Sequence, residues 1–430
     1  MHPTRGTGRG YREYLLLTEG CRPMPKWLPY AKTLTRPHRQ LTLFLHSMKR
    51  IVIFQTELLS VSQTFVQQQA LGLKRWSPLM IGYRFETPSL SPNGLPIELI
   101  PGGIRRIGWF AARCRFWLGL ADPAAVRLFR SSGASLVHVH FATDATEIWP
   151  SVKAAGLPML ITLHGYDVNV HREWWESGHA GMRWRTYPRR LVALSTEPNV
   201  HFLAVSKAIR DRAIEFGLPN DKISVSYIGI NADFFRPDGV PIKMRPKRIL
   251  FVGRLVPKKA PLLLVRVFAD VLKKVPDAEL IMVGEGPLRG AAEKLAMRLH
   301  APIVFVGSQT SFEVLAHLRE ARVLCLPSVT AANGDAEGFG LVLLEAQAAG
   351  VPVVSSALGG STEGLIDGVT GYRCSEGDRA MLAERLVSIL VNDALAENMS
   401  TQGISFVKDR FSLKKLTSDL ESHYDRVSGG

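Results

Sequence analysis

The sequence lacks long hydrophobic runs and has few cysteines. No stretch of its 430 residues approaches the ~20 apolar residues that cross a bilayer as a helix, so we do not expect the chain to be an integral membrane protein. The four cysteines are widely separated and include no C-x-x-C pair. They indicate neither a disulfide framework nor a zinc site, and we infer a reducing, cytoplasmic location and no bound metal. These cysteines are Cys21, Cys114, Cys325 and Cys374.

Acidic residues are also scarce relative to basic ones. The chain has 53 Lys and Arg against 38 Asp and Glu, a formal net charge of +15. Such an excess favours an anionic ligand or surface, and nucleic acid, bilayer headgroups and diphosphates all suit it. The basic residues are spread along the chain, and no helix-turn-helix, zinc-finger or RNA-stacking motif occurs. We therefore expect no nucleic-acid partner.

The chain is long enough for two domains, each with its own core. Short apolar runs alternate with helical stretches in both halves, which predicts the α/β class with doubly wound parallel sheets. Met48 is followed by the first buried strand, so residues before it are either a disordered extension or follow from a mis-set upstream start. We expect an extension at 1–47, a first domain at 48–238, a linker at 239–247, a second domain at 248–410 and a final helix at 411–430.

Residues 336–350, A-E-G-F-G-L-V-L-L-E-A-Q-A-A-G, lie between two strand-like runs and predict a βαβ unit whose helix begins at Gly338–Gly340. Backbone N–H groups at a helix start attract an anion such as phosphate. Glu337 and Glu345 would lie roughly 12 Å apart if the segment were helical throughout, at ~1.5 Å per residue. That span suits a nucleotide sugar and exceeds the about 5–9.5 Å of a glycosidase pair. By themselves, the two glutamates could equally be a helix cap and a solvated residue.

Two further motifs precede this unit in the second half. The run R-I-L-F-V-G-R-L-V-P-K-K-A begins at Arg248 and places Arg254 at a strand end and Lys259 before the next helix. A guanidinium and an ammonium in these places can hold two phosphates from different directions. The turn G-E-G-P contains Gly286, and Pro287 interrupts the G-x-G-x-x-G pattern of dinucleotide binding.

Two loops of the first half also carry polar candidates. L-H-G-Y-D-V follows a strand end, where open α/β sheets bind ligands, and contains His164 and Asp167. Q-T-E-L-L-S-V-S-Q-T-F-V follows the first strand and contains Ser60 and Ser62. Ser62 either caps the following helix or contacts a ligand, and His164 could equally be a packing residue.

Taken in order, these motifs resemble retaining glycosyltransferases of family 4, also called glycosyltransferase group 1, in the exopolysaccharide or colanic-acid subgroup. The resemblance covers Met48 to the C-terminus. It implies the GT-B fold, two Rossmann-like domains facing a central cleft, with a final helix that returns to the first domain. Two substitutions depart from the family pattern: serines replace loop glycines near residue 60, and Ala260 replaces a glycine. The implied catalytic residues are His164 and Glu337; the implied donor-binding residues are Arg254, Lys259, Gly286, Gly338, Phe339, Gly340 and Glu345; Ser60, Ser62 and Asp167 are weaker candidates for an acceptor or diphosphate loop.

The resemblance implies a hexosyltransferase that moves a sugar from a nucleotide diphosphate to a glycan or polyprenyl-linked oligosaccharide in cell-surface polysaccharide synthesis. No D-x-D motif occurs, so we expect no metal and no other cofactor. We expect front-face transfer, in which the leaving phosphate takes the acceptor's proton. The alternatives are a GT-B epimerase or phosphorylase and, from another class, a basic nucleic-acid-binding protein. The oligomeric state is left open.

Basic and aromatic residues interleave in residues 105–117, R-R-I-G-W-F-A-A-R-C-R-F-W. Such a segment either seats at a membrane interface, with its rings at headgroup depth, or forms an ordinary helix with its aromatics in the core. The first alternative predicts peripheral attachment to an anionic membrane at the inner face of the plasma membrane.

Overall fold

The computed structural model describes residues 48–60, 63–86, 90–101 and 118–429. The chain separates into two units, Met1–Ser47 and Met48–Gly430, of which the second contains all the described structure. The expected extension at 1–47, Ser62 and the basic and aromatic segment 105–117 lie outside the described residues.

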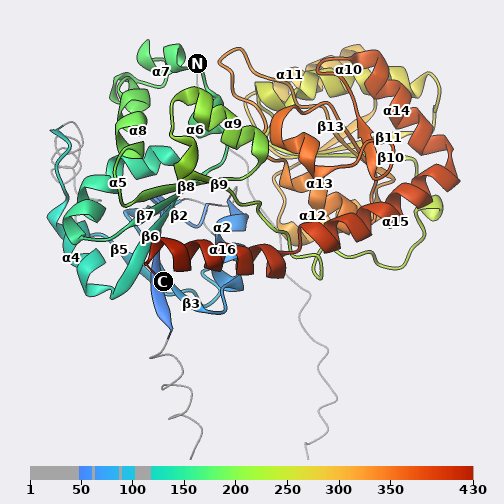
Figure 1. Ribbon diagram of the computed structural model, residues 1–430. Helices are drawn as coiled ribbons and strands as arrows, with labels where there is room; N and C mark the ends of the chain where they lie inside the picture. Colours follow the sequence, from blue (N-terminus) through green and yellow to red (C-terminus); the bar gives the residue numbers. More distant parts are fainter. Residues whose placement is uncertain (1–47, 61–62, 87–89, 102–117, 430) are drawn as a thin grey trace, which may run out of the picture. The chain divides into compact units, whose positions relative to one another are not determined.

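A seven-stranded parallel sheet forms the first half of the larger unit (Figure 1). Its central strands are buried on both faces, as expected where helices cover both sides, and they include the strand predicted directly after Met48. The two edge strands, Ile97–Leu99 and Ile223–Val225, have only three residues each and were not predicted. In spatial order the strands are β5 (Ile97–Leu99), β3 (Trp76–Gly82), β1 (Lys49–Phe54), β6 (Ala134–His140), β7 (Met159–Leu163), β8 (Val200–Ala204) and β9 (Ile223–Val225).

A six-stranded parallel sheet forms the second half. The two strand-like runs that flank residues 336–350 are strands, Val323–Leu326 and Val353–Ser355, and the short strand Gly371–Arg373 was not predicted. The predicted linker 239–247 lies between the two sheets and contains a single 3₁₀ turn, Ile242–Met244. In spatial order the strands are β12 (Ile303–Gly307), β11 (Glu279–Val283), β10 (Arg248–Val252), β13 (Val323–Leu326), β14 (Val353–Ser355) and β15 (Gly371–Arg373).

Helices connect most of the parallel strands, as βαβ crossovers require. A separate two-stranded ladder pairs β2 (Glu57–Leu58) with β4 (Arg84–Phe85). The helices of the first half are α2 (Thr64–Gly72), α4 (Pro123–Ser131), α5 (Ala142–Ala155), α6 (Tyr166–Asn169), α7 (Arg172–Glu176), α8 (Tyr187–Ser195) and α9 (Lys207–Phe216). Those that follow are α10 (Pro261–Leu272), α11 (Arg289–Arg298), α12 (Ser311–Glu320), α13 (Leu341–Ala348), α14 (Arg379–Val391), α15 (Asp393–Arg410) and α16 (Leu413–Val427).

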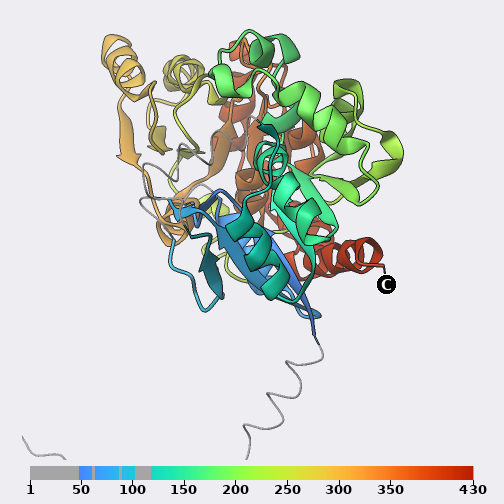
Figure 2. The ribbon, with the colours of Figure 1, turned by 90° about the vertical axis from the view of Figure 1, so that its left-hand side faces the viewer.

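The final helix α16 lies against the first sheet. Figures 1 and 2 show it in red beside the blue and teal strands of the first half. Its Leu420 and Tyr424 pack against Ile51, Leu136 and Leu160, which lie on neighbouring strands of that sheet. The C-terminus of the chain thereby completes the core of its N-terminal half.

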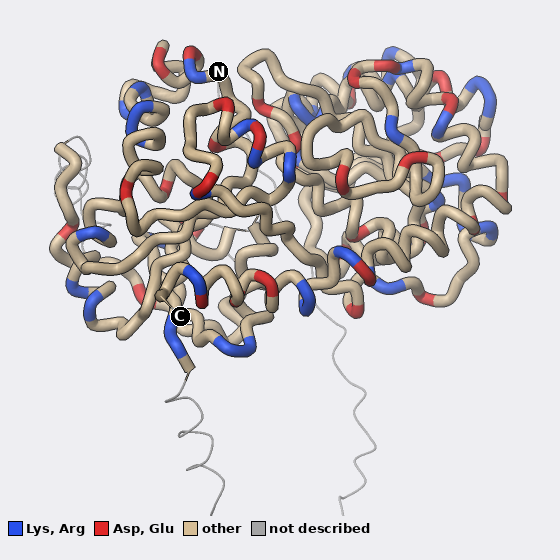
Figure 3. The backbone as a smooth tube through the Cα atoms, viewed as in Figure 1, with Lys and Arg blue, Asp and Glu red and all other residues tan. Residues whose placement is uncertain are grey.

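Charges of both signs are distributed over the whole described chain (Figure 3). No helix among the described residues has the length and apolar character needed to cross a membrane.

Candidate active site

A cavity of about 950 Å³ lies where strands of both sheets end. The loops after β1, β6 and β7 line it from one sheet, and the loop after β10 and the start of α13 line it from the other. Ligands of open α/β sheets bind at the carboxyl ends of strands, because loops and helix starts converge there. The predicted residues that line this cavity are Ser60, His164, Arg254, Lys259, Glu337, Gly338, Phe339, Gly340 and Glu345.

Three basic side chains enter the cavity from the loop after β10. The Lys259 Nζ lies 2.9 Å from Glu337 Oε1, and the Lys258 Nζ lies 3.0 Å from Asp335 Oδ1. Arg254 is exposed, and its side chain has no hydrogen bond or ion pair with any residue that the structure describes, whereas its backbone carbonyl accepts from Val256. The loop therefore offers one unpaired guanidinium and two ammonium groups that carboxylates hold in place.

The Glu337 carboxylate is buried yet charged. Burial acts to raise its pKa, but the positive charges of Lys259, Lys258 and Arg254 outweigh that effect and leave the pKa below its usual value. A buried carboxylate stays ionised only with such partners. Glu337 is therefore a hydrogen-bond acceptor in the wall of the cavity.

Helix α13 begins later than predicted. Its first residue is Leu341, because Gly340 has φ 76° and ψ 59° and so lies outside the right-handed helical region. Gly338 precedes the helix and passes close to the other half: a Cβ on it would lie 1.9 Å from the carbonyl oxygen of His164. Only glycine fits this approach. The Phe339 ring is buried against Tyr227 and Phe411.

Glu345 lies in the second turn of α13 and also lines the cavity. Burial raises the pKa of its carboxyl to about 7. The two glutamates thus differ in charge state near neutral pH, because only Glu337 has lysines beside it.

His164 follows β7 and lies among aromatic rings. Its ring centroid is 4.4 Å from that of Phe141 and 4.9 Å from that of Phe65, and its Nε2 lies 3.1 Å from Nδ1 of His140. Burial and the neighbouring His140 hold the pKa of His164 well below its ordinary value, so the ring is neutral. A neutral imidazole can act as a hydrogen-bond partner without placing positive charge in the site.

Asp167 does not line the cavity, contrary to its predicted place in a ligand loop. Its carboxylate accepts hydrogen bonds from the backbone N–H groups of Ala142, at 2.6 Å, and His164, at 2.8 Å. Asp167 is fully buried and ties the loops after β6 and β7 together. Its contacts assign it to positioning His164.

Gly286 also lies outside the cavity lining. A Cβ at this position would lie 2.5 Å from the carbonyl oxygen of Leu255, so the glycine lets two loops pack together. Backbone hydrogen bonds from Leu255 to Glu285 and from Leu288 to Leu255 fix the same contact. Gly286 therefore supports the loop that carries Arg254 and does not face the ligand space.

The first half contributes polar residues that the sequence motifs did not reveal. Asp144 accepts a hydrogen bond from the backbone N–H of Thr56 at 2.8 Å, and burial raises its pKa to about 6. Glu147 pairs with Arg183. Their place in the first two turns of α5, the helix that follows β6, is the signal that could have identified Asp144 and Glu147. The unpredicted lining residues of this half include Thr56, Glu57, Gln63, Arg84, Glu86, Asp144, Glu147, Arg183 and Trp184.

Two family models match consecutive parts of the chain. One is described as Glycosyltransferase Family 4 and matches residues 85–234. The other is described as Glycosyl transferases group 1 and matches residues 235–406. The first model begins after β3 and so covers five of the seven strands of the first sheet, and the second covers all six strands of the second sheet.

The chain matches two curated relatives over most of their length. The chain is 30% identical to the amylovoran biosynthesis glycosyltransferase AmsK of Erwinia amylovora over 305 residues, which are 70% of this chain and 72% of the relative. It is 32% identical to the GDP-mannose-dependent alpha-(1-6)-phosphatidylinositol monomannoside mannosyltransferase of Mycolicibacterium smegmatis over 364 residues, 79% of this chain and 91% of the relative.

Solved structures share the fold at low sequence identity. Anabaena HepE in complex with UDP has a TM-score of 0.71 at 18% identity and covers 88% of this chain and 100% of its own. Sucrose-phosphate synthase from Thermosynechococcus elongatus has a TM-score of 0.67 at 20% identity, with 88% and 99% coverage.

The two Rossmann-like sheets, with a cavity at the carboxyl ends of both, define a GT-B enzyme fold. The chain belongs to glycosyltransferase family 4, with a group 1 domain in its second half, and is a glycosyltransferase.

Proposed function

We propose that this glycosyltransferase moves a hexose, with retention of configuration, from a nucleoside-diphosphate sugar to a glycan or polyprenyl-linked oligosaccharide. The observation that carries the proposal is one cavity that joins a cationic loop, the start of α13 and His164. The cationic loop and the start of α13 would bind the diphosphate, and the sugar would then lie near His164. The relative AmsK, named for amylovoran biosynthesis, supports a role in exopolysaccharide or other cell-surface polysaccharide synthesis.

The proposed chemistry is electrostatic stabilisation of the leaving diphosphate. Arg254 and Lys259 stabilise the negative charge that develops there, together with the backbone N–H groups at the start of α13. Glu337 accepts hydrogen bonds from sugar hydroxyls, and Glu345 accepts them from the ribose. The leaving phosphate takes the acceptor's proton, and His164 stays neutral beside the oxocarbenium-like centre.

The donor nucleoside is proposed to be uridine. The Anabaena HepE structures contain UDP, UDP with glucose, or UDP-glucose, which supports this choice. The GDP-mannose-dependent relative makes guanosine the competing candidate. A thermal-shift series with UDP, GDP and ADP decides between them, because a ligand at a hundred times its Kd adds about 2.7 kcal/mol of stability.

The acceptor is proposed to bind in the part of the cavity formed by the first half. Glu57, Asp144 and Glu147 line this part, and Trp184 offers a flat ring. Carboxylates accept hydrogen bonds from hydroxyls, and an aromatic face packs on a sugar ring. This lining favours a neutral sugar at the reacting end of the acceptor, whether or not a lipid is attached further away.

Peripheral attachment to the cytoplasmic face of an anionic membrane is the remaining part of the proposal. Each Lys or Arg near such a surface adds about 1 kcal/mol, so a few give reversible attachment. The net charge of +15 favours it. Co-sedimentation with anionic and neutral vesicles at low and high salt measures this attachment. If the protein does not bind anionic vesicles at low salt, a soluble acceptor becomes the better proposal.

Product analysis tests the central proposal. UDP-glucose and candidate glycans are incubated with the enzyme, and the anomeric configuration of the product is read by NMR. We expect acceptor-dependent formation of an α-linked product, unchanged by EDTA. Conversion of the sugar nucleotide without an acceptor would identify an epimerase, release of a sugar phosphate in inorganic phosphate would identify a phosphorylase, and a β-linked product would exclude retention.

A further inference from the structure

The alternation of side chains along β6 and β7 places a row of polar groups on one face of the first sheet. Residues two apart in a strand share a face. Leu136 and Leu160 pack against α16, so His138, His140 and Thr162 project on that same side. In an otherwise apolar core, this polar row needs partners.

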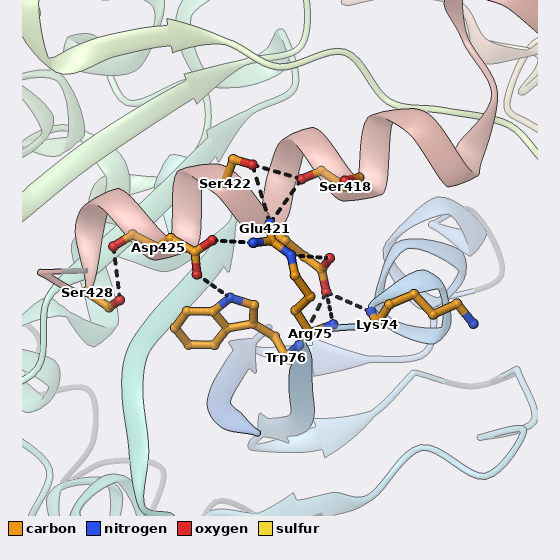
Figure 4. Close-up of polar contacts among 8 residues, drawn as sticks. All are labelled: Lys74, Arg75, Trp76, Ser418, Glu421, Ser422, Asp425 and Ser428. Atoms are coloured by element: carbon orange, nitrogen blue, oxygen red, sulfur yellow. Dashed lines mark hydrogen bonds and ion pairs between the residues drawn. The ribbon is translucent and has the colours of Figure 1, made fainter. Parts of the chain in front are cut away.

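Helix α16 is held against this face by a dense set of polar contacts (Figure 4). The buried carboxylate of Glu421 accepts hydrogen bonds from the backbone N–H groups of Lys74, Arg75 and Trp76 at 2.7, 2.6 and 3.2 Å. Asp425 accepts from the Trp76 indole at 3.0 Å and pairs with Arg75 at 2.7 Å. These contacts fix the position of the helix along the strands.

Tyr424, between these two carboxylates on α16, reaches into the polar row. Its hydroxyl lies 2.8 Å from Nδ1 of His138, and the hydroxyl of Thr162 lies 2.7 Å from the other ring nitrogen. His138 therefore has a hydroxyl at each nitrogen. Both its rotamer and its tautomer depend on these two groups.

The row continues from His138 to the cavity. The ring centroids of His138 and His140 are 4.3 Å apart, and His140 Nδ1 lies 3.1 Å from His164 Nε2. His138, His140 and Tyr424 are each only 1% exposed. Burial lowers the pKa of His140 to about 3, so its ring is neutral and carries a single N–H. The position of that N–H decides whether His140 Nδ1 donates a hydrogen bond to His164 Nε2 or accepts one from it.

We propose that Tyr424 of α16 is a positioning residue for His164, acting through His138 and His140. The inference rests on the proposed function, in which His164 lies beside the reacting centre. Tyr424 fixes His138, His138 supports the ring of His140, and His140 fixes the ring nitrogen of His164 that faces away from the substrate. The C-terminal helix is in this way part of the catalytic apparatus as well as of the core.

NMR of the histidine ring nitrogens tests the connection without any substrate. The probe is protein labelled with 15N-histidine, in which single substitutions assign the signals of His138, His140 and His164. We expect Tyr424→Phe to shift the signals of all three rings, because His138 loses one of its two hydroxyl partners. A change confined to His138 would overturn the proposal.

Asp425→Asn is the matched control for the NMR test. It weakens the contact between α16 and Trp76 one residue further along the helix and leaves the Tyr424 hydroxyl in place. We expect the ring signals of His140 and His164 to stay where they are. If Asp425→Asn shifts them as far as Tyr424→Phe does, general loosening of the helix is the cause and the proposal fails.

Thr162→Val gives a second, independent variant, since it removes the hydroxyl on the opposite side of His138 and keeps the side-chain shape. We expect it to shift the His140 and His164 signals as Tyr424→Phe does. Unshifted signals would contradict the proposal even if Tyr424→Phe did not fold.

Kinetics with UDP-glucose add a functional readout. We expect Tyr424→Phe to lower kcat about tenfold with an unchanged KM, the size expected for one buried hydrogen bond that acts on the transition state. In a His164→Ala background the same change should leave the residual kcat unaltered, and a further tenfold loss there would show that Tyr424 acts by another route.

The failure of the proposed function has a different signature. If His164→Ala alone keeps full kcat, His164 is not part of the site and Tyr424 has nothing to position. If His164→Ala lowers kcat and Tyr424→Phe does not, the site assignment stands and only this inference falls.

Discussion

Lys259 and Glu337 form an ion pair at the point where a diphosphate would bind, with 2.9 Å between Nζ and Oε1. Their side chains are 15% and 8% exposed, so neither charge is well solvated. A buried pair of this kind is sensitive to the loss of one partner, because the other charge is left uncompensated. The ion pair therefore keeps the Lys259 ammonium in the cavity before the ligand arrives.

Removal of the Glu337 charge separates nucleotide binding from catalysis. We expect Glu337→Gln to bind UDP several-fold more tightly than the wild type, since a negative charge near the diphosphate is lost and Lys259 is released. The same variant should lose about a hundredfold or more in kcat with UDP-glucose, because a neutral amide is a weaker acceptor for sugar hydroxyls. Isothermal titration and product assays measure the two effects. Weaker UDP binding would show that Glu337 positions Lys259 and has no part in repelling the ligand.

Loss of the Arg254 or Lys259 side chain is predicted to weaken binding of the diphosphate and to leave nucleoside binding unchanged. We expect Arg254→Ala and Lys259→Ala each to weaken UDP binding about 10- to 100-fold, the range for one hydrogen bond to a charged group. Uridine affinity should change little. Equal losses for UDP and uridine would contradict the diphosphate assignment.

Arg266→Ala is the matched control for these cation substitutions. Arg266 is exposed on α10, and its guanidinium donates to the carbonyl of Leu262 in the same helix. The change removes the same charge from the second half of the chain outside the cavity lining. UDP affinity should remain that of the wild type.

Glu345 gives donor binding a pH dependence. Its pKa of about 7 means that the carboxyl is increasingly protonated below neutral pH, and a protonated carboxyl is a poorer acceptor for two ribose hydroxyls. We therefore expect the affinity for UDP-glucose, whose diphosphate does not titrate in this range, to fall as pH decreases from 8 to 6. Glu345→Gln should bind weakly at both pH values with no such slope. A wild-type affinity that is flat across this range would exclude the role in ribose binding.

The buried His140 makes the folded state sensitive to acid. Its pKa is about 3 in the folded protein against the ordinary 6.5, so the unfolded chain binds the proton more tightly. Its contribution to stability is therefore present above pH 6.5 and is lost as pH falls toward 3. Relative to His140→Asn, we expect the wild type to lose about 2 kcal/mol of unfolding free energy between pH 7 and pH 5. Urea unfolding of both proteins at the two pH values measures the difference.

If the unfolding free energy changes equally with pH in the wild type and in His140→Asn, His140 titrates normally in the folded protein. The comparison between two variants is needed because Asp144 and Asp167 act in the opposite direction. Burial raises the pKa of both carboxyls to about 6, so their contribution is lost as pH rises. These carboxyls are present in both proteins and cancel in the difference.

The positions of the longer strands and of the site loops were predictable from the sequence alone. Apolar runs bounded by polar turns specify buried parallel strands, and motifs that follow such runs lie at strand ends. For this reason His164, Arg254 and Glu337 were correctly expected to follow strands, and the structure brings them to one cavity. The edge strands β5 (I-E-L) and β15 (G-Y-R) were not predicted, because neither contains an apolar run, whereas β14, also of three residues, was predicted from its two adjacent valines.

The tertiary structure alone decided which side chains pair. Gly340 could have begun a helix, but its positive φ delays α13 to Leu341. Asp167 was expected to contact a ligand, but its carboxylate accepts hydrogen bonds from two backbone N–H groups of different loops. The hydroxyl of Tyr424 meets His138 across 286 residues of sequence. Such contacts depend on how a helix is placed on a sheet, and local patterns along the chain carry no information about that placement.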